Sequence, residues 1–457
     1  MVTIPLGYAE GSANNENLSR IRLRNMYITE NGYSPDQKAR MTRPTMDLFK
    51  EISINPIYGI WYQNGTLSND WFIVSGETLY RVNHDTFDLT ELGQIPGTKP
   101  CLFAGTTDRI IIVRNSVAYS TDGVTVVPIT MPDSRPVGSV STIDGVFILG
   151  QEDAQRFYWI FPGEVNPDPL SFASAERTPD SVRSINVISD EIWFLGATGV
   201  EVWQTTGNVD APYQRISGRV YSEGCVDPAT ACTSSFNGYP ALLWVTEKRA
   251  VMLAQGNPTR ISTKAVEDAL KTSSNFRAWA FRWNQHDFYA VTTDEQTLVY
   301  DLKSQVWAKW DSFGFPFWRA HLGIQINENV YAADAQYGIV WQFNDGYSDN
   351  GEPIVREVSG FVLSQTTFQD CSSVNVRINA GWPPTYTNTP SLEMRWSDDY
   401  GFSWSNFFPQ QMGQKGAYEY DVTYRSLGSF QRPGREFEFR FSDLAKFRID
   451  YATMNEV

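Results

Sequence analysis

Acidic side chains are the first candidates for chemistry in this chain, because glycoside hydrolysis needs two carboxyl groups on opposite sides of the scissile bond. The 457 residues include 52 Asp and Glu. Candidates for such a pair include Asp190, Glu191, Glu201, Asp287, Asp334 and Asp345. Their spacing along the chain does not show which two of them would face each other as a catalytic pair. The sequence therefore supplies acids for a hydrolase but no defined pair.

One motif, the stretch from Ser397 to Trp404, fits the Asp-box pattern S-x-D-x-G-x-[S/T]-W. Asp399 can accept hydrogen bonds from turn amides, Gly401 permits a tight backbone, and Trp404 can pack beneath the hairpin. Sialidases carry several such boxes within their blades, whereas this chain has one complete box. We interpret Ser397, Asp399, Gly401 and Trp404 as a structural turn and not as a catalytic site.

Metal and cofactor sites lack their usual residue patterns. The four cysteines (Cys101, Cys225, Cys232, Cys371) are scattered and are predicted to be reduced. Cys225 and Cys232 would need two histidines to complete a zinc site, but the three histidines (His84, His286, His321) fall in different repeats. Motifs for dinucleotides, P-loops and nucleophile elbows are missing. We expect no catalytic residue, no cofactor and no metal.

The elements that would position these residues are short β-strands. Between Asp287 and Asp311, two β-branched or aromatic runs and a Val-Trp pair are separated by polar turns, which predicts a meander. Similar units begin near Trp71, Arg109, Val146, Glu191, Ala241, Asp287 and Asn329. Intervals of roughly 40–50 residues are typical of β-propeller blades. We therefore predict an all-β fold with a propeller of six or seven blades.

The chain divides into three predicted parts. Residues 1–57 form an N-terminal segment that could close the propeller, residues 58–346 form the propeller, and the turn-rich stretch 344–353 ends it. Residues 347–457 contain alternating runs that predict an antiparallel β-sandwich. One short helix is expected at 264–271, where Val266 and Leu270 share a face.

Charge is distributed unevenly along the chain. The net charge is −15, with 37 Lys and Arg against 52 Asp and Glu, which argues against a protein that grips nucleic-acid phosphates. Most of the excess acid lies in the predicted propeller. Arg20, Arg22 and Arg24 instead alternate with Ile21 and Leu23, the period of a half-buried strand with one basic face. We interpret these arginines as a solvated face or as a protein interface.

Two regions together resemble the tail hub, or nozzle, proteins of short-tailed bacteriophages, also called packaged-DNA stabilisation proteins. The resemblance rests on an asparagine-led strand and an Arg-Pro segment near the start, and on a series of strand motifs near the end. These are Asn25–Glu30, Arg43–Phe49, Met394–Ser397 through Trp404, Gly413–Tyr420, Tyr424–Gly428 and Glu436–Asp443. With a propeller-like array between them, they cover most of the chain.

The resemblance implies a virion structural protein of the tail, assembled in the host cytoplasm. Such hubs form rings, usually hexameric homo-oligomers, below the portal-adaptor proteins. They retain packaged DNA and conduct it during genome ejection, and tailspikes or tail fibres and a needle or plug attach nearby. DNA would pass through the lumen without specific binding, and no stable membrane insertion is expected. We further expect a lumen lined by acidic and uncharged polar residues.

Two other classes of protein remain open. A glycan-binding or glycan-cleaving propeller, sialidase-like or kelch-like, would need an aromatic-lined pocket with paired acids. A cellular propeller scaffold would need a partner-binding rim. The oligomeric state discriminates between the scaffold and the phage hub.

Overall fold

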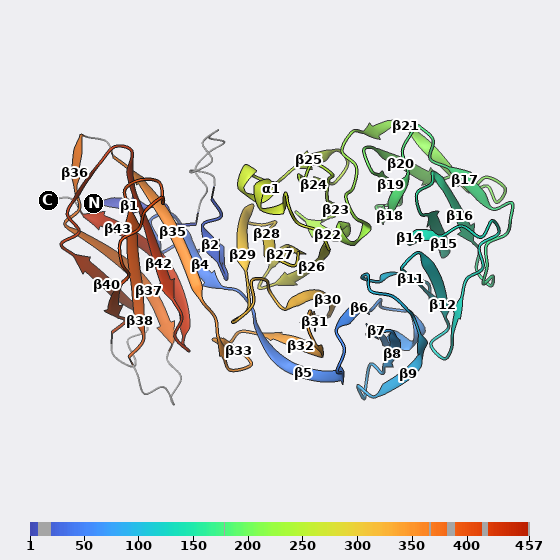
Figure 1. Cartoon of the computed structure of the whole chain (residues 1–457), viewed down its shortest axis with the longest axis horizontal. Coiled ribbons are helices and arrows are strands. Elements are labelled where there is room, and N and C mark those ends of the chain that lie inside the picture. Colours follow the sequence, from blue (N-terminus) through green and yellow to red (C-terminus); the bar gives the residue numbers. More distant parts are fainter. Residues whose placement is uncertain (8–19, 178, 365–366, 382–388, 414–418, 456–457) are drawn as a thin grey trace.

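The protein is almost entirely β-structure, with a ring of blades joined to a separate pair of sheets (Figure 1). The computed structural model describes the 457-residue chain except for residues 8–19, 178, 365–366, 382–388, 414–418 and 456–457. Of the residues that the structure describes, 56% are in strands and 3% in helices. The expectation of an all-β propeller fold is confirmed.

The described residues form seven four-stranded antiparallel blades, of which the first six are meanders. The first four blades follow chain order. Blade 1 contains β6 (Ile57–Trp61), β7 (Trp71–Ser75), β8 (Thr78–Val82) and β9 (Leu89–Gln94). Blade 2 contains β10 (Leu102–Gly105), β11 (Ile110–Arg114), β12 (Val117–Thr121) and β13 (Val126–Pro128). Blade 3 contains β14 (Val137–Ile143), β15 (Val146–Gln151), β16 (Arg156–Ile160) and β17 (Phe172–Ser174). Blade 4 contains β18 (Val182–Ile188), β19 (Glu191–Gly196), β20 (Val200–Thr205) and β21 (Tyr213–Tyr221).

The last three blades complete the ring. Blade 5 contains β22 (Cys232–Phe236), β23 (Tyr239–Val245), β24 (Val251–Ala254) and β25 (Pro258–Arg260). Blade 6 contains β26 (Arg277–Trp283), β27 (His286–Thr292), β28 (Thr297–Asp301) and β29 (Val306–Trp310). Blade 7 contains β30 (Ala320–Ile326), β31 (Asn329–Asp334), β32 (Gly338–Asn344) and β5 (Thr45–Ser53). The helix expected at 264–271 is present as α1 (Lys264–Leu270), between blades 5 and 6.

The second strand of each blade carries the strongest hydrophobic signal. Every residue of β7 and β11 is buried, as are the apolar centres of β19, β23 and β27. These strands face neighbouring blades on both sides, so they read as continuous apolar runs and not as alternating ones. The seven repeat starts predicted from the sequence fall on or next to these seven strands.

The N-terminal segment closes the propeller. Strand β5 pairs antiparallel with β32, with Met46 opposite Phe343 and Leu48 opposite Trp341. The last blade therefore takes its outermost strand from a part of the chain almost 300 residues earlier. This pairing joins the two ends of the array without a free gap between blades 7 and 1.

The C-terminal domain consists of two antiparallel sheets that pack face to face, as in a β-sandwich. One sheet has the order β3 (Met26–Glu30), β4 (Lys38–Thr42), β43 (Lys446–Asn455), β37 (Ser373–Gly381), β40 (Glu419–Arg425), with β1 (Val2–Ile4) beside β43. The other contains β35 (Arg356–Leu363), β42 (Gly434–Phe441), β38 (Ser391–Ser397) and β39 (Phe408–Gln411). Val376 and Ile449 from the first sheet share a core with Met394 and Phe437 from the second. Residues 1–57, predicted as a segment of their own, are thus divided between this domain and the propeller.

A continuous sheet connects the two domains. The two-residue strand β2 (Leu23–Arg24) lies parallel to β29 of blade 6 and antiparallel to β35 of the C-terminal domain. The result is a nine-stranded sheet that begins with the four strands of blade 6 and continues through β2 into the C-terminal domain. Strand β2 thus covers the outer edge of blade 6. An exposed strand edge invites pairing with other chains, so the C-terminal domain also protects that edge.

Smaller elements complete the described fold. They are the 3₁₀ turns η1 (Leu67–Asn69) and η2 (Pro228–Thr230), the hairpin β33 (Ser348–Asp349) with β34 (Glu352–Pro353), and the pair β36 (Phe368–Asp370) with β41 (Ser429–Gln431). Of the predicted Gly413–Tyr420 motif, residues 414–418 lie outside the described part of the chain.

Candidate functional sites

The six acids that sequence analysis considered for hydrolysis lie in different parts of the propeller. Asp190, Glu191 and Glu201 belong to blade 4, Asp287 to blade 6, Asp334 to blade 7 and Asp345 to the segment after it. Several of them have structural partners. Asp334 is fully buried and accepts hydrogen bonds from the Trp341 indole at 2.7 Å and from two turn amides, and it pairs with Arg319 at 2.6 Å. Glu191 pairs with Arg219, and Asp345 pairs with Lys446 at 2.9 Å.

The Asp-box forms a turn that satisfies itself. Asp399 accepts hydrogen bonds from the Ser403 amide at 2.9 Å, the Ser403 hydroxyl at 2.5 Å and the Ser397 hydroxyl at 2.8 Å. These bonds, chiefly that from the Ser403 hydroxyl, lower the pKa of Asp399 to about 2. Gly401 has φ of +80°, and the Trp404 indole donates to its carbonyl at 3.2 Å. The geometry is that of a folding element.

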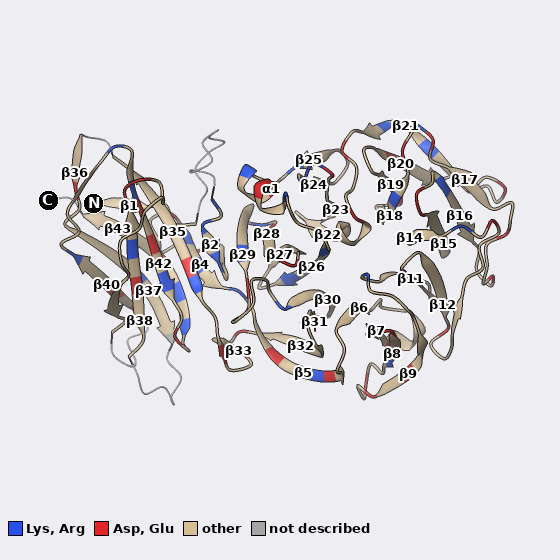
Figure 2. Cartoon of the chain, in the orientation of Figure 1, with Lys and Arg blue, Asp and Glu red and all other residues tan. Residues whose placement is uncertain are grey.

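The arginine strand contacts acids of the same chain. Arg22 is buried and its Nη1 lies 2.9 Å from Glu436 Oε1. Arg24 pairs with Asp311 at 2.6 Å and with Glu357 at 3.3 Å. Figure 2 shows bases and acids side by side on β35 and β42, the strands that receive these arginines. The three arginines therefore lie where the N-terminal segment joins the propeller to the C-terminal domain.

Arg20 brings two of the predicted features together. Its Nη2 donates to the Gly401 carbonyl at 3.2 Å, and its Nη1 lies 3.8 Å from Glu436. A Cβ added at Gly401 would lie only 2.0 Å from Arg20 Nη1. The Asp-box turn is thus a docking surface for the N-terminal segment, which its sequence pattern does not reveal.

The same junction contains a buried arginine whose ion pair the sequence analysis did not predict. Arg43, in the Arg-Pro segment before β5, has a fully buried side chain that pairs with Asp349 at 2.6 Å and donates to Asn25 at 2.9 Å. Asn25 in turn donates to Asp311 at 2.8 Å. The Arg-Pro pair before a predicted strand is the sequence signal that could have indicated this anchor. Its acidic partner Asp349 lies 306 residues away, so the pair could not be predicted.

The described cysteines and histidines form no cluster that could hold a metal. Cys101, Cys225 and Cys371 are buried free thiols, and burial raises their pKa values to about 12, 12 and 11. His321 is buried and lies 2.9 Å from the carbonyl of Ile57. Burial, with a smaller contribution from Arg277, lowers the pKa of His321 to about 3.

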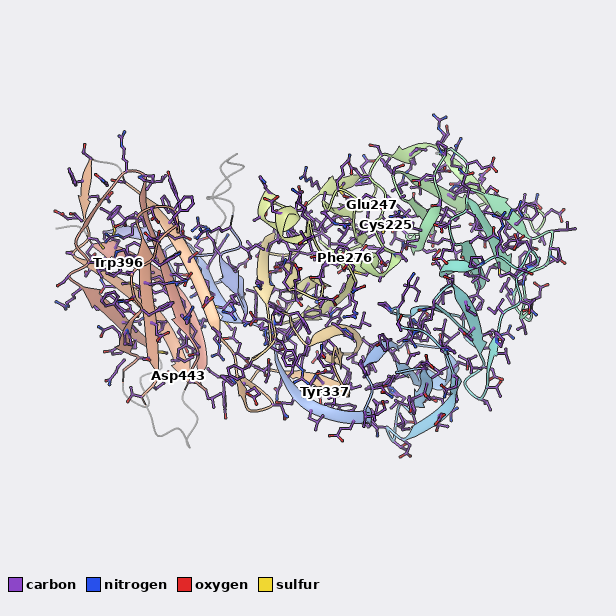
Figure 3. All side chains as sticks on the ribbon, viewed as in Figure 1. Cys225, Glu247, Phe276, Tyr337, Trp396 and Asp443 are labelled. Atoms are coloured by element: carbon purple, nitrogen blue, oxygen red, sulfur yellow. The ribbon has the colours of Figure 1, made fainter. Side chains whose placement is uncertain are left out.

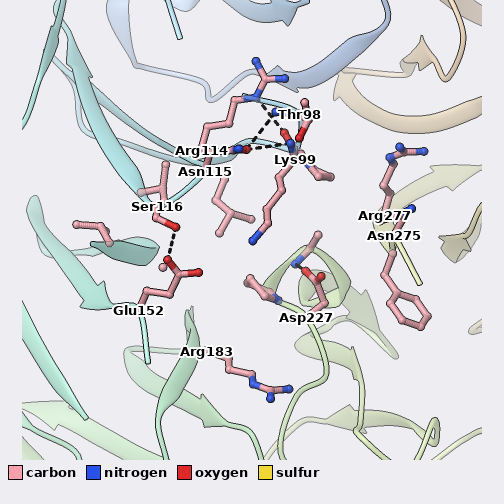
Figure 4. A pocket seen from close by; sticks show the side chains of 18 of the residues that line it. Thr98, Lys99, Arg114, Asn115, Ser116, Glu152, Arg183, Asp227, Asn275 and Arg277 are labelled. Carbon is pink, nitrogen blue, oxygen red and sulfur yellow. Dashed lines mark hydrogen bonds between the residues drawn. The ribbon is translucent and has the colours of Figure 1, made fainter. Parts of the chain in front are cut away.

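A polar cavity of about 610 Å³ opens where the inner strands of the blades begin; we call it the axial funnel (Figure 4). Loops from several blades form its wall. Its charged lining residues are Lys99, Arg114, Arg183 and Arg277 against Glu152, Asp153 and Asp227. A second cavity of about 560 Å³, the axial channel, continues between the inner strands and shares Pro100, Leu102, Pro228 and Ala229 with the funnel. Figure 3 draws the side chains of the blades as sticks and labels Phe276, which lines the funnel.

Most charged groups of the funnel have structural partners. Arg114 donates to the carbonyls of Lys99, Gly76 and Ile95 at 2.7–3.0 Å. Arg183 donates to the carbonyls of Cys225 and Val226 and contacts Glu247. Glu152 accepts from Ser116, and Asp227 caps η2 through the Ala229 amide. Burial raises the pKa of Asp227.

A third cavity, of about 810 Å³, lies between the hairpins of blades 6 and 7 that follow their inner strands. Its lining is rich in carboxamides, with Trp283 as an aromatic wall. The carboxamides are Asn284, Gln285, Gln325, Asn327, Asn329, Gln342 and Asn344. Asn284 and Asn327 have positive φ, which their turns require and which asparagine tolerates, so the turns already explain these two side chains.

The fold and these sites define a seven-bladed propeller that is closed by its N-terminal segment and tied by ion pairs to two further antiparallel sheets. The model of the family described as "Bacteriophage P22 Gp10, beta-propeller" matches residues 18–347. The chain belongs to this family, whose members stabilise packaged DNA. The match covers the propeller together with β2 to β5, and membership identifies a phage structural protein of the virion.

Other comparisons give weaker similarities. No curated protein matches the chain. YCF48 from Cyanidioschyzon merolae has 11% identity and a TM-score of 0.44, covering 66% of this chain and 99% of YCF48. A structure of YCF48 bound to D1 peptide has 10% identity and a TM-score of 0.41, covering 69% and 97%. The extracellular domain of the one-component system BT4673 from B. thetaiotaomicron has 9% identity and a TM-score of 0.45, covering 84% and 59%. All three TM-scores are below 0.5.

Within the described residues, none of the helices has the length and apolar character needed to cross a bilayer.

Proposed function

We propose that this protein is a non-enzymatic component of a short phage tail. It would form a homo-oligomeric ring, usually hexameric in this family, below the portal-adaptor proteins. The ring would retain packaged DNA, conduct it during ejection, and carry tailspikes or fibres and a needle or plug. The family match over residues 18–347 carries this proposal.

The connections between the parts of the chain support a role as a structural subunit that transmits force. A strand from the N-terminal segment closes the last blade, and a second strand joins blade 6 to the C-terminal domain. A closed sheet leaves few free edges, and the buried ion pairs of Arg22 and Arg43 hold the two domains together. A subunit of this kind can transmit force between its neighbours without opening.

The charge distribution supports a conduit that does not grip DNA. Residues 51–346 hold 20 Lys and Arg against 33 Asp and Glu, a net charge of −13. Attraction to DNA grows with the number of Lys and Arg that contact phosphates. We propose that the lumen of the ring is lined mainly by acidic and uncharged residues, while the arginine strand stays within the subunit.

Particles made without this protein test the proposal. We expect heads that fill with DNA but lose it, and recovery when the wild-type protein is supplied. Cryo-electron microscopy of complete particles should place six copies below the portal. Stable, infectious particles that lack the protein would contradict the proposed role.

A further inference from the structure

The axial funnel contains an arginine without a partner. Within the described part of the chain, the half-buried Arg277 side chain makes no hydrogen bond and no ion pair, and its Nε is buried. An ionised group removed from water without a partner destabilises the protein. Burial accordingly lowers the pKa of Arg277. Its position in the wall of an open cavity suggests that its partner comes from outside the chain.

Three acids around Arg277 are already engaged, while Asp153, the remaining acid of the funnel, is exposed to solvent. The carboxylate of Asp294, which attracts Arg277 most strongly, accepts a hydrogen bond from Asn275 at 2.6 Å. Asp227 caps η2, and Glu152 accepts from Ser116. Lys99 adds a second cation that extends toward the middle of the funnel (Figure 4). Among the described residues, neither its ammonium group nor the guanidinium of Arg277 forms a hydrogen bond or an ion pair.

The funnel also differs in charge from the surrounding propeller. Its lining holds four bases and three acids, a small positive balance, whereas residues 51–346 together have a net charge of −13. The net charge of the propeller repels an acidic ligand, and the positive balance of this lining attracts one. The funnel therefore favours an anion that reaches the axis.

The dimensions limit what can enter. The funnel and the axial channel are each of the size of small-ligand pockets, roughly 300–1,000 Å³. The lining of the channel has no charged side chain, but includes Ser141, Asn186 and Thr233. This space suits a few residues of extended polypeptide, whose backbone can bond to such polar groups, and it is too small for a DNA duplex.

We propose that the axial funnel docks an acidic peptide segment, whose carboxylate pairs with Arg277 and Lys99 and whose backbone enters the axial channel. A guanidinium and a carboxylate can form two parallel hydrogen bonds, the strongest neutralisation open to Arg277. That the segment belongs to another tail protein rests on the proposed function. The charge and the size of the site do not depend on that function.

Binding of labelled hexaglutamate to the purified full-length chain tests the site, with hexaglutamine as the uncharged probe. Fluorescence anisotropy should show at least tenfold tighter binding of hexaglutamate. Arg277→Met and the exposed Lys99→Gln should each weaken this binding at least tenfold. Arg282→Gln is the matched control, because Arg282 lies on the same strand at the opposite face of the ring, and it should change binding less than twofold.

A stability measurement separates docking from a structural role. If Arg277 awaits a partner, Arg277→Met should leave the Tm of the free protein unchanged or raise it, and hexaglutamate should raise the Tm of the wild type alone. A lower Tm for Arg277→Met, equal binding of both peptides, or preferential binding of a 20-base-pair duplex would overturn the proposal. Such a failure would leave the tail role intact, because that role is tested on particles.

Discussion

Arginine side chains occupy both the junction between the domains and the axial funnel, but their surroundings are opposite. At the junction, Arg22 and Arg43 are buried against carboxylates within 3 Å. In the funnel, Arg277 has no such partner in the described structure. Burial of a paired arginine fixes a structure, because removal of either partner leaves a charge uncompensated. Burial of an unpaired one destabilises the free protein and favours a bound state.

Replacing Arg43 by alanine should have the largest effect. The change leaves Asp349 buried without its cation and removes the anchor before β5, so we expect the free energy of unfolding to fall by about 3–5 kcal/mol. Urea denaturation would measure it. Arg282→Ala, on an exposed side chain, should stay within about 0.5 kcal/mol of wild type. A loss below about 1 kcal/mol for Arg43→Ala would remove the distinction between the two regions.

Lowering the pH should destabilise the folded protein through His321. Its pKa is about 3 in the folded protein, against about 6.5 in the unfolded chain, so the unfolded chain binds more protons between these values. Stability should therefore fall as pH drops from about 6.5 toward 3, by about 2 kcal/mol between pH 7 and 5 from this residue. The difference in pH dependence between wild type and His321→Gln isolates this contribution from those of the carboxylates. Identical pH profiles would show that His321 is not held neutral.

Gly401→Val tests the contact of the Asp-box with the arginine strand. Valine disfavours a φ of +80°, and its Cβ would displace Arg20, so we expect a loss of more than about 1 kcal/mol. Gly65→Val provides the control for backbone strain, because Gly65 has φ of +84° and no atom near its would-be Cβ. Equal losses at the two positions in thermal unfolding would mean that the Arg20 contact contributes nothing.

Arg277→Met should have the smallest effect and the opposite sign. Removing an unpaired, half-buried cation is expected to stabilise the free protein by about 0.5–1 kcal/mol, a common gain for a substitution of this kind. The same urea denaturation applies, and Arg22→Met gives the contrast, since it should destabilise by removing the buried partner of Glu436 and leaving only the longer contact with Arg20. If both variants shift stability in the same direction, the two regions do not differ as described.

The sequence by itself determined the local structure of most of the propeller. Strands such as β27 and β28 consist mainly of aromatic, aliphatic and β-branched residues, and a polar turn separates them, so their positions follow from neighbouring residues alone. The Asp-box turn was predictable for the same reason, because Ser397, Asp399 and Ser403 bond to one another within one hairpin. Blade number stayed at six or seven because one strand of the last blade is distant in the chain.

Only the tertiary structure decided which distant groups meet. Strand β5 pairs with β32, Arg43 meets Asp349, and Arg20 reaches Gly401, each across about 300 residues or more. The axial funnel draws its residues from loops of several blades, so its unpaired arginine has no signature in any single segment. A hydrophobic pattern specifies that a strand is buried, but not against which neighbour. That choice depends on how the edges and charges of the whole ring fit together.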